Sequence, residues 1–269
     1  MADLKLKIGR IPFANLFPIF YTLEKEFDCS SYEFIDGVPS LLNEMLREGV
    51  IDLSPSSSVE YLRNSSLYGF VDGISVSSKG PVGSIFLFSS KPVDQLDGST
   101  IYVTSQSATS VALLDIVLKR FCGIKYSSLV AQNPASTDAE AFLLIGDEAL
   151  KFGSMFKRHA PELSRYPFIY DLGEIWYEKT GLPFVFALWI VRKELYNKAD
   201  IRHELFVKFV ADLMKAKEMS LHNLIEIAGH SPMKAFLGED EIISYWNILD
   251  YELSDEHKNG LYLFRDYLD

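Results

Sequence analysis

The segment between Ile101 and Leu114 combines residue types and spacing that suit anion binding. A β-branched run at Ile101–Thr104 stops there, and an apolar helical pattern begins near Val111. The hydroxyl side chains in between are those of Thr104, Ser105, Ser107, Thr109 and Ser110. The first turn of a helix presents unpaired N–H groups at the positive end of its dipole, so it binds carboxylate or phosphate without Lys or Arg. We expect a pocket for a small anion here; the alternative is a helix start capped by Ser and Thr.

Other polar clusters follow or adjoin expected strands. They consist of Asn15 between Pro12 and Pro18, of Ser56, Ser57 and Ser58 ahead of a helix, of Gly83 and Ser84 in a glycine-containing loop, and of Asp147 at a helix start. An Asn amide both donates and accepts hydrogen bonds, so Asn15 is a candidate for assisting acid–base chemistry. Each cluster also has a structural alternative, because Asn, Ser and Asp are ordinary helix caps and Gly is an ordinary turn residue.

Composition and charge exclude several function classes. The 269 residues carry a net charge of −11, which disfavours nucleic acid and anionic membranes as partners. No apolar run is long enough to span a membrane, and the N-terminus lacks the pattern of a secretory signal. Cys29 and Cys122 stand far apart in the sequence, as expected of thiols in a reducing cytoplasm.

Metal, nucleotide and nucleophile chemistry lack sequence support. None of the five histidines has metal-ligand spacing to Cys, Asp or Glu, and no metal site is expected. The chain contains no phosphate-binding glycine motif and no nucleophile elbow.

The hydrophobic pattern alternates between short strands and helices. Expected strands are residues 4–11, 32–35, 51–54, 68–76, 82–89, 100–104, 128–130, 143–145, 168–171 and 183–191. The expected helices are one that ends near residue 26, the ranges 39–48, 59–63, 109–122 and 139–142, one that begins at residue 146, and the ranges 172–179, 204–221, 222–228, 239–249 and 255–268. This alternation predicts an α/β protein with parallel sheets.

Two βα sets in series predict two lobes. The polar, turn-rich stretch 89–98 is the expected crossing, and the apolar strand at 183–191 carries the chain back. Lobe 1 is then 1–92 plus 188–269, and lobe 2 is 93–187. Because such proteins bind ligands where strand C-termini and helix N-termini converge, we expect the ligand in a cleft between the lobes.

Taken together, the clusters resemble one known family. The motifs, in order, are Pro12-Phe-Ala-Asn-Leu-Phe-Pro18, Gly49-x-Ile-Asp-Leu-Ser54, Ser57-Ser-Val-Glu-Tyr61, Ser78-Lys-Gly-Pro-Val-Gly-Ser84, Thr104-Ser-Gln-Ser-Ala-Thr-Ser110, Leu144-Ile-Gly-Asp-Glu-Ala-Leu150, Asp171-Leu-Gly-x-x-Trp176 and Thr180-Gly-Leu-Pro-Phe-Val-Phe-Ala-Leu-Trp189. As a set they are similar to the chorismate dehydratase family, menaquinone biosynthesis protein A. The resemblance covers about residues 8–192 and leaves the C-terminal helices unmatched.

The resemblance implies a two-lobed, type II periplasmic-binding-protein-like fold used by a cytoplasmic enzyme without a cofactor. It implies conversion of chorismate to 3-[(1-carboxyvinyl)oxy]benzoate plus water in the futalosine route, with chorismate as the small-molecule partner and the oligomeric state left open. Asn15 corresponds to the family residue linked to catalysis. Ala14 departs from the polar or aromatic residue that often precedes it. The substrate-binding candidates are Ser56, Ser57, Gly83, Ser84, Thr104, Ser107, Ala108, Thr109, Ser110 and Asp147.

Three other functions share the expected fold. A solute-binding protein for a small aromatic carboxylate uses the same helix ends. The sister enzyme that releases dihydroxynaphthoate is expected to use a His base in its second lobe, where this chain has only His159. A silent regulator that binds an aromatic acid is the third alternative.

Overall fold

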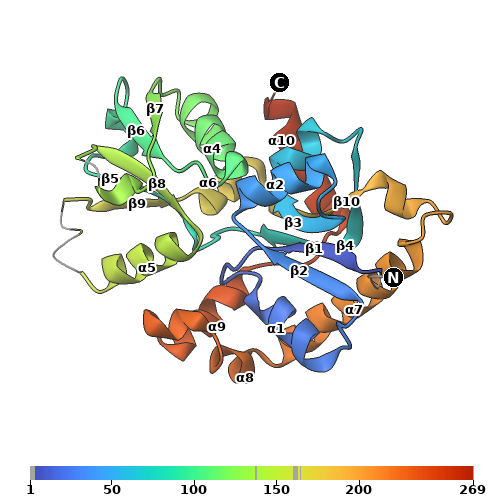
Figure 1. Ribbon diagram of the computed structural model, residues 1–269. Coiled ribbons are helices and arrows are strands. Elements are labelled where there is room, and N and C mark those ends of the chain that lie inside the picture. The colour runs from blue at the N-terminus through green and yellow to red at the C-terminus, as the bar shows by residue number, and fades with distance from the viewer. Residues whose placement is uncertain (1–3, 137, 160–162, 164, 269) are drawn as a thin grey trace. The chain divides into compact units, whose positions relative to one another are not determined.

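The residues that the computed structural model describes are 4–136, 138–159, 163 and 165–268. They form two α/β units, each with its own five-stranded sheet (Figure 1). The first unit comprises Met1–Val76, Phe186–Trp246 and Tyr251–Ser254, and the second comprises Ser77–Val185, Asn247–Asp250 and Asp255–Asp269.

These bounds differ from the lobes expected from the sequence, 1–92 plus 188–269 and 93–187. The chain passes between units inside strand β4, Tyr68–Ser78, because the next strand, β5, Ile85–Ser89, already pairs within the second sheet. The last helix also belongs to the second unit, since the ring of Phe264 meets those of Trp176 and Phe184 edge-on.

The sheet of the first unit has the strand order β2-β1-β3-β10-β4. Its remaining strands are β1 Leu6–Arg10, β2 Tyr32–Asp36, β3 Leu53–Ser57 and β10 Phe184–Arg192. Strand β1 pairs in parallel with β2 and β3, whereas β10 runs antiparallel to β3. The prediction of a parallel sheet is therefore right for β1–β3 and wrong for β10, which is a returning strand rather than the end of a βα unit.

Helices cover both faces of this sheet. They are α1 Phe17–Glu26, α2 Pro39–Glu48, α3 Ser58–Arg63, α7 His203–His222, α8 Leu224–Ala228 and α9 Glu239–Ile248, with 3₁₀ turns η5 Lys193–Tyr196 and η6 Pro232–Ala235. In Figure 1, α2 lies on one face, and α1, which packs against α7, lies on the other. Helix α2 ends as predicted at Gly49, whose φ of 75° suits a residue without a side chain.

The sheet of the second unit has the strand order β7-β6-β8-β5-β9. Its remaining strands are β6 Thr100–Val103, β7 Ser127–Val130, β8 Ala141–Ile145 and β9 Phe168–Asp171. Its helices are α4 Ala108–Asp115, the π-helical η2 Ile116–Phe121, α5 Gly146–Lys157, α6 Leu172–Thr180 and α10 Asp255–Leu268, with 3₁₀ turns η1 Val93–Gln95 and η3 Pro134–Ser136. Strand β6 is parallel to β7 and β8, and β5 is antiparallel to β8 and β9.

Two predicted helices of this unit differ from the structure. Residues 139–142 do not form a helix, because Ala141 and Phe142 pair with strands on both sides and belong to the central strand β8. The helix predicted at 109–122 begins at Ala108 and continues as a π-helix from Ile116.

The close approach of α10 to the segment before β10 depends on Gly260. A Cβ at this position would overlap the backbone carbonyl oxygen of Pro183. In an open helix, Gly→Ala stabilises by roughly 1 kcal/mol, but here we expect Gly260→Ala to destabilise the protein by about 1–3 kcal/mol. Urea unfolding would measure this loss of stability. The control is Asn259→Ala, because Asn259 is the exposed neighbour of Gly260 and its substitution creates no such overlap. Equal stability of the two variants would contradict the expectation.

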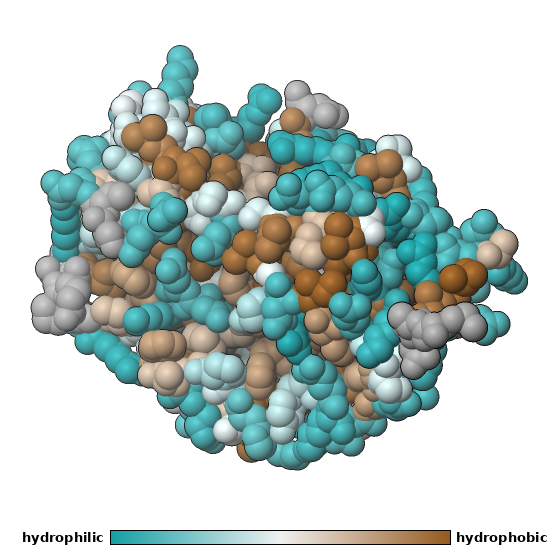
Figure 2. Space-filling view, in the orientation of Figure 1, coloured by the Kyte–Doolittle hydropathy of each residue, from teal (hydrophilic) through white to brown (hydrophobic). Residues whose placement is uncertain are grey.

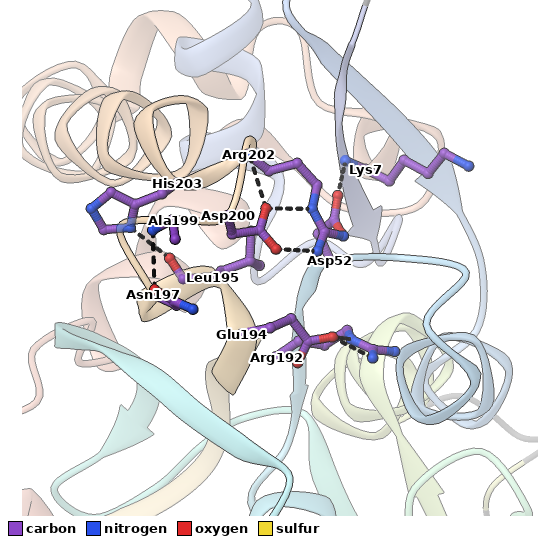
Figure 3. Close-up of polar contacts among 10 residues, drawn as sticks. All are labelled: Lys7, Asp52, Arg192, Glu194, Leu195, Asn197, Ala199, Asp200, Arg202 and His203. Atoms are coloured by element: carbon purple, nitrogen blue, oxygen red, sulfur yellow. Dashed lines mark hydrogen bonds and ion pairs between the residues drawn. The ribbon is translucent and has the colours of Figure 1, made fainter.

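An ion-pair network ties the start of α7 to the sheet of the first unit (Figure 3). Arg202 donates to buried Asp52 at 2.6 Å and to both carboxylate oxygens of Asp200 at 2.7 and 2.9 Å. Asp52 also accepts the backbone N–H of Lys7 at 2.8 Å, so β1, β3 and the turn before α7 are joined through one carboxylate.

This network predicts a loss of stability in acid. The hydrogen bonds from Arg202 lower the pKa of Asp200 from 3.8 to about 2. Because the folded-state pKa lies below the unfolded one, the contribution of Asp200 is present above the unfolded pKa and is lost as the pH falls through the folded pKa. We expect urea midpoints of the wild type and Asp200→Asn to differ near neutral pH and to converge towards about pH 2. A pH-independent difference would contradict this.

Hydrophilic residues occupy much of the visible surface, with hydrophobic residues exposed between them (Figure 2). The large hydrophobic side chains exposed to solvent include those of Ile201, Ile225, Val130 and Phe236. Among the described residues, no helix has both the length and the apolar character needed to cross a membrane.

Candidate functional site

Asn15 lies in the turn between β1 and α1, and it does not cap the helix. The N-cap position belongs to Leu16, and no side chain there accepts a hydrogen bond from the helix. Among the described residues, the side-chain oxygen Oδ1 of Asn15 is buried and has no hydrogen-bond partner. An unpaired buried acceptor costs about 1–3 kcal/mol, and a ligand that donates a hydrogen bond to Asn15 would remove that cost.

The two serines at the end of β3 have different roles, one as a helix cap and one with an unpaired hydroxyl. Ser57 is the N-cap of α3, and its Oγ accepts the N–H of Glu60 at 3.4 Å. Ser56 is fully buried, and within the described chain its Oγ has no partner. The sequence correctly predicts one capping serine, and Ser56 is left as the better candidate for a ligand contact.

Asn15 and Ser56 belong to the same edge of one sheet. Strands β1 and β3 are parallel, with Ile8 opposite Leu53. The turn with Asn15 follows the carboxyl end of β1, and Ser56 stands near the carboxyl end of β3. Two unpaired polar atoms thus gather where parallel strands end, the place where α/β proteins bind ligands.

The hydroxyl-rich segment after β6 does start a helix, as predicted. Ser107 is the N-cap of α4: its Oγ accepts the N–H of Ser110 at 3.2 Å and lies 2.9 Å from the Ser110 hydroxyl. Thr104 Oγ1 accepts the N–H of Gln106 at 3.1 Å, which fixes the approach to the helix. Thr109 is buried and Ala108 is exposed, so of the first two residues of α4 only Ala108 is accessible to solvent.

Gly83 and Ser84 belong to a loop that a buried carboxylate holds in place. Asp171, at the end of β9, accepts the N–H groups of Val82 at 3.0 Å and Gly83 at 2.7 Å. It also caps α6 through the N–H groups of Gly173 and Glu174. Since its own amide is used in this way, Gly83 shapes the loop but does not offer its N–H to a ligand.

Burial raises the pKa of Asp171, and the four amide donors partly offset that rise. The sequence marks Asp171 only as part of a strand-to-helix motif. An Asp between a strand and a helical pattern signals the helix cap. The contact with residues 82 and 83, almost ninety positions earlier in the chain, has no local signal.

Asp147 is placed in the first turn of α5, but Ile145 is the N-cap, so Asp147 is not the capping residue. Ser84 is beside it, because the Ser84 carbonyl accepts the N–H of Gly146 at 2.8 Å. The ends of β6 and β8 and the start of β5 lie at one edge of this sheet, since β6 and β8 are parallel and β5 is antiparallel to β8. This edge carries Ser84, Thr104, Ser107, Asp147 and Asp171.

Among the described residues, no group of three or more His, Cys, Asp or Glu side chains is arranged to hold a metal ion. His159 is exposed in the turn after α5, away from the edge that carries Ser84 and Asp147.

Comparison with known proteins gives the family. The sequence model of a family described as menaquinone biosynthesis matches residues 6–269. The chain belongs to the menaquinone biosynthesis family. A relative named chorismate dehydratase, from Thermus thermophilus, is 32% identical over 270 residues, which cover 97% of this chain and 94% of that protein. A second protein of that name, from Campylobacter jejuni, is 32% identical over 71% of this chain and 70% of its own length. The resemblance predicted from the motifs is confirmed.

Solved structures confirm the predicted fold of this menaquinone biosynthesis family member. A protein from Archaeoglobus fulgidus has a TM-score of 0.75 at 15% identity, covering 99% of this chain and 97% of its own. The periplasmic aliphatic sulphonate binding protein SsuA from Escherichia coli has a TM-score of 0.65 at 14% identity, covering 98% of this chain and 91% of its own. The chain therefore has a periplasmic-binding-protein-like fold of two α/β units.

Proposed function

We propose that this protein is a chorismate dehydratase that forms 3-[(1-carboxyvinyl)oxy]benzoate and water in the futalosine route to menaquinone. The observation that carries the proposal is the alignment of nearly the whole chain with a chorismate dehydratase. The unpaired buried oxygen of Asn15 supports it, because a catalytic amide must have a free hydrogen-bonding position before substrate arrives.

The chemistry suits a site made of amides and hydroxyls. Dehydration removes the proton from ring carbon C3 and the hydroxyl from C4, and the new C3=C4 bond completes an aromatic ring. The loss of water is redox-neutral, and aromatisation favours the product, so the proposal includes no cofactor. The protein has mainly to orient the ring and to stabilise two carboxylates.

Six of the candidate residues have a proposed role. The Asn15 amide hydrogen-bonds the reacting ring or the leaving C4 hydroxyl, and the substrate's own enolpyruvyl carboxylate acts as the base. The start of α4, with Ser107, Thr109 and Ser110, holds one carboxylate, because helix N-termini favour anions. Polar groups of Ser56 and Ser84 serve the rest of the substrate. A cytoplasmic location is part of the proposal and is supported by the free thiols of Cys29 and Cys122.

The test is to mix purified protein with chorismate and to follow the ultraviolet spectrum and the product mass, with heat-denatured protein as the control. Loss of one water and appearance of a benzoate chromophore support the proposal. Unchanged chorismate retained on the protein would instead indicate a solute-binding protein, and neither turnover nor retention would refute both functions.

A further inference from the structure

The C-terminal segment contacts the turn that carries Asn15 through two buried aromatic donors. The indole Nε1 of Trp246 in α9 donates to the carbonyl oxygen of Ala14 at 2.8 Å. The hydroxyl of Tyr251, just after α9, donates to the carbonyl oxygen of Asn15 at 2.6 Å. All four residues belong to the first unit.

These two hydrogen bonds fix the backbone on both sides of Asn15. The Ala14 carbonyl belongs to the rigid peptide plane before the Asn15 Cα, and the Asn15 carbonyl belongs to the plane after it. Once both planes are held, the φ and ψ angles of Asn15 are set, and so is the direction in which its side chain leaves the backbone.

Both donors are themselves held firmly. Trp246 is fully buried and stacks on Phe17, with ring centroids 6.3 Å apart and planes inclined by 11°. The Tyr251 carbonyl accepts the N–H of Ser75 in β4 at 3.1 Å. Burial raises the pKa of Tyr251 well above 10, so its hydroxyl keeps the proton that it donates at every ordinary pH.

We propose that Tyr251 and Trp246 are positioning residues that hold the amide of Asn15 in its productive orientation. The inference rests on the proposed function, because it gives these residues a part in the dehydration of chorismate. It also gives the C-terminal segment a role beyond packing. Neither side chain is expected to touch the substrate, so their loss affects catalysis through Asn15 alone.

The experiment compares Tyr251→Phe and Trp246→Phe with a matched control, Tyr32→Phe. Tyr32 is also buried, and its hydroxyl donates to Asp212 at 2.7 Å and accepts from Nζ of Lys208 at 3.0 Å. It stands opposite Leu6 at the amino end of β1, whereas Asn15 follows the carboxyl end. The control therefore removes a buried tyrosine hydroxyl and its hydrogen bonds at the other end of the strand.

We expect Tyr251→Phe to lower kcat about 10-fold with KM unchanged, since a small misplacement of a reacting group is enough for such a loss. Trp246→Phe is expected to act in the same direction, and it carries the test if Tyr251→Phe does not fold. Tyr32→Phe is expected to keep the wild-type kcat. Equal kcat values for Tyr251→Phe and Tyr32→Phe would overturn the inference.

A second readout does not depend on activity. The side-chain amide signal of Asn15 in a nitrogen–proton NMR spectrum, assigned by its absence in Asn15→Ala, should move in Tyr251→Phe and stay in place in Tyr32→Phe. An unmoved signal would overturn the positioning role even if turnover changed. If the wild type does not convert chorismate, the proposed function fails, while this spectrum still decides whether Tyr251 positions Asn15.

Discussion

Replacing Asn15 with alanine is expected to lower kcat for chorismate about 100-fold, the size of effect seen when one aimed hydrogen-bonding group is removed from an active site. The structure separates this from a folding effect. Because Asn15 is not the cap of α1, its loss removes no hydrogen bond from the helix. Because its Oδ1 has no partner in the described chain, the loss of this oxygen leaves no buried protein donor without a hydrogen bond.

Steady-state kinetics and equilibrium binding of chorismate would measure the two effects separately. Asn43→Ala is the matched control: Asn43 is another asparagine of the first unit whose buried Oδ1 has no partner among the described residues. We expect this control to keep wild-type turnover. An unchanged kcat in Asn15→Ala would refute the catalytic role, and a raised KM with normal kcat would make Asn15 a binding residue only.

The second large effect is expected at Asp171, whose two carboxylate oxygens share the N–H of Val82, at 3.1 and 3.0 Å, and otherwise have different partners. Oδ1 accepts both helix amides of α6, Gly173 at 2.9 Å and Glu174 at 3.2 Å. Oδ2 accepts Gly83 at 2.7 Å. Asp171→Asn can keep the cap through its remaining oxygen, since Asn is as good an N-cap as Asp. It sets an NH₂ group against the N–H of Gly83 and so releases the loop.

We therefore expect Asp171→Asn to lower the free energy of unfolding by about 1.5–3 kcal/mol, the range for a hydrogen bond to a charged group. If Ser84 contacts the substrate as proposed, KM for chorismate should rise about 10-fold, equivalent to roughly 1.4 kcal/mol of binding. Asp171→Ala loses the cap as well and should be less stable than Asp171→Asn.

Urea unfolding and steady-state kinetics would test these expectations. The control is Asp97→Asn in the same unit, because Asp97 is exposed and its side chain accepts the N–H of Lys125 at 2.8 Å. A wild-type KM for a destabilised Asp171→Asn would show that the loop does not hold the substrate.

The sequence predicts the elements that local rules determine. Helix α2 ends at Gly49 as its C-cap signal indicates, and the apolar run at β10 is buried along most of its length. The start of strand β8 is not predictable from local pattern, because Ala141 and Phe142 fit a helix as well as a strand. Their conformation is set by the neighbours β5 and β6 on either side, which local pattern does not reveal.

The same limit applies to the site. The sequence motifs identify Asn15, Ser56 and the start of α4, because each places a polar group near the carboxyl end of a strand. Asp171 is missed as a partner of Gly83, and Tyr251 is missed as a partner of Asn15, since those contacts join residues 88 and 236 positions apart. No spacing rule reaches that far, and only the folded chain brings the groups together.

The place of β10 in its sheet bears on how the protein is made. Strand β10 lies between β3 and β4, yet it is the last strand of that sheet to leave the ribosome. All five strands of the other sheet, which end at Asp171, are synthesised before it. The nascent chain must therefore carry β3 and β4 with unpaired edges while a whole later sheet emerges, and such edges invite aggregation. Stalling translation before residue 184 should accordingly yield chains that chaperones retain, with the later sheet formed ahead of the earlier one.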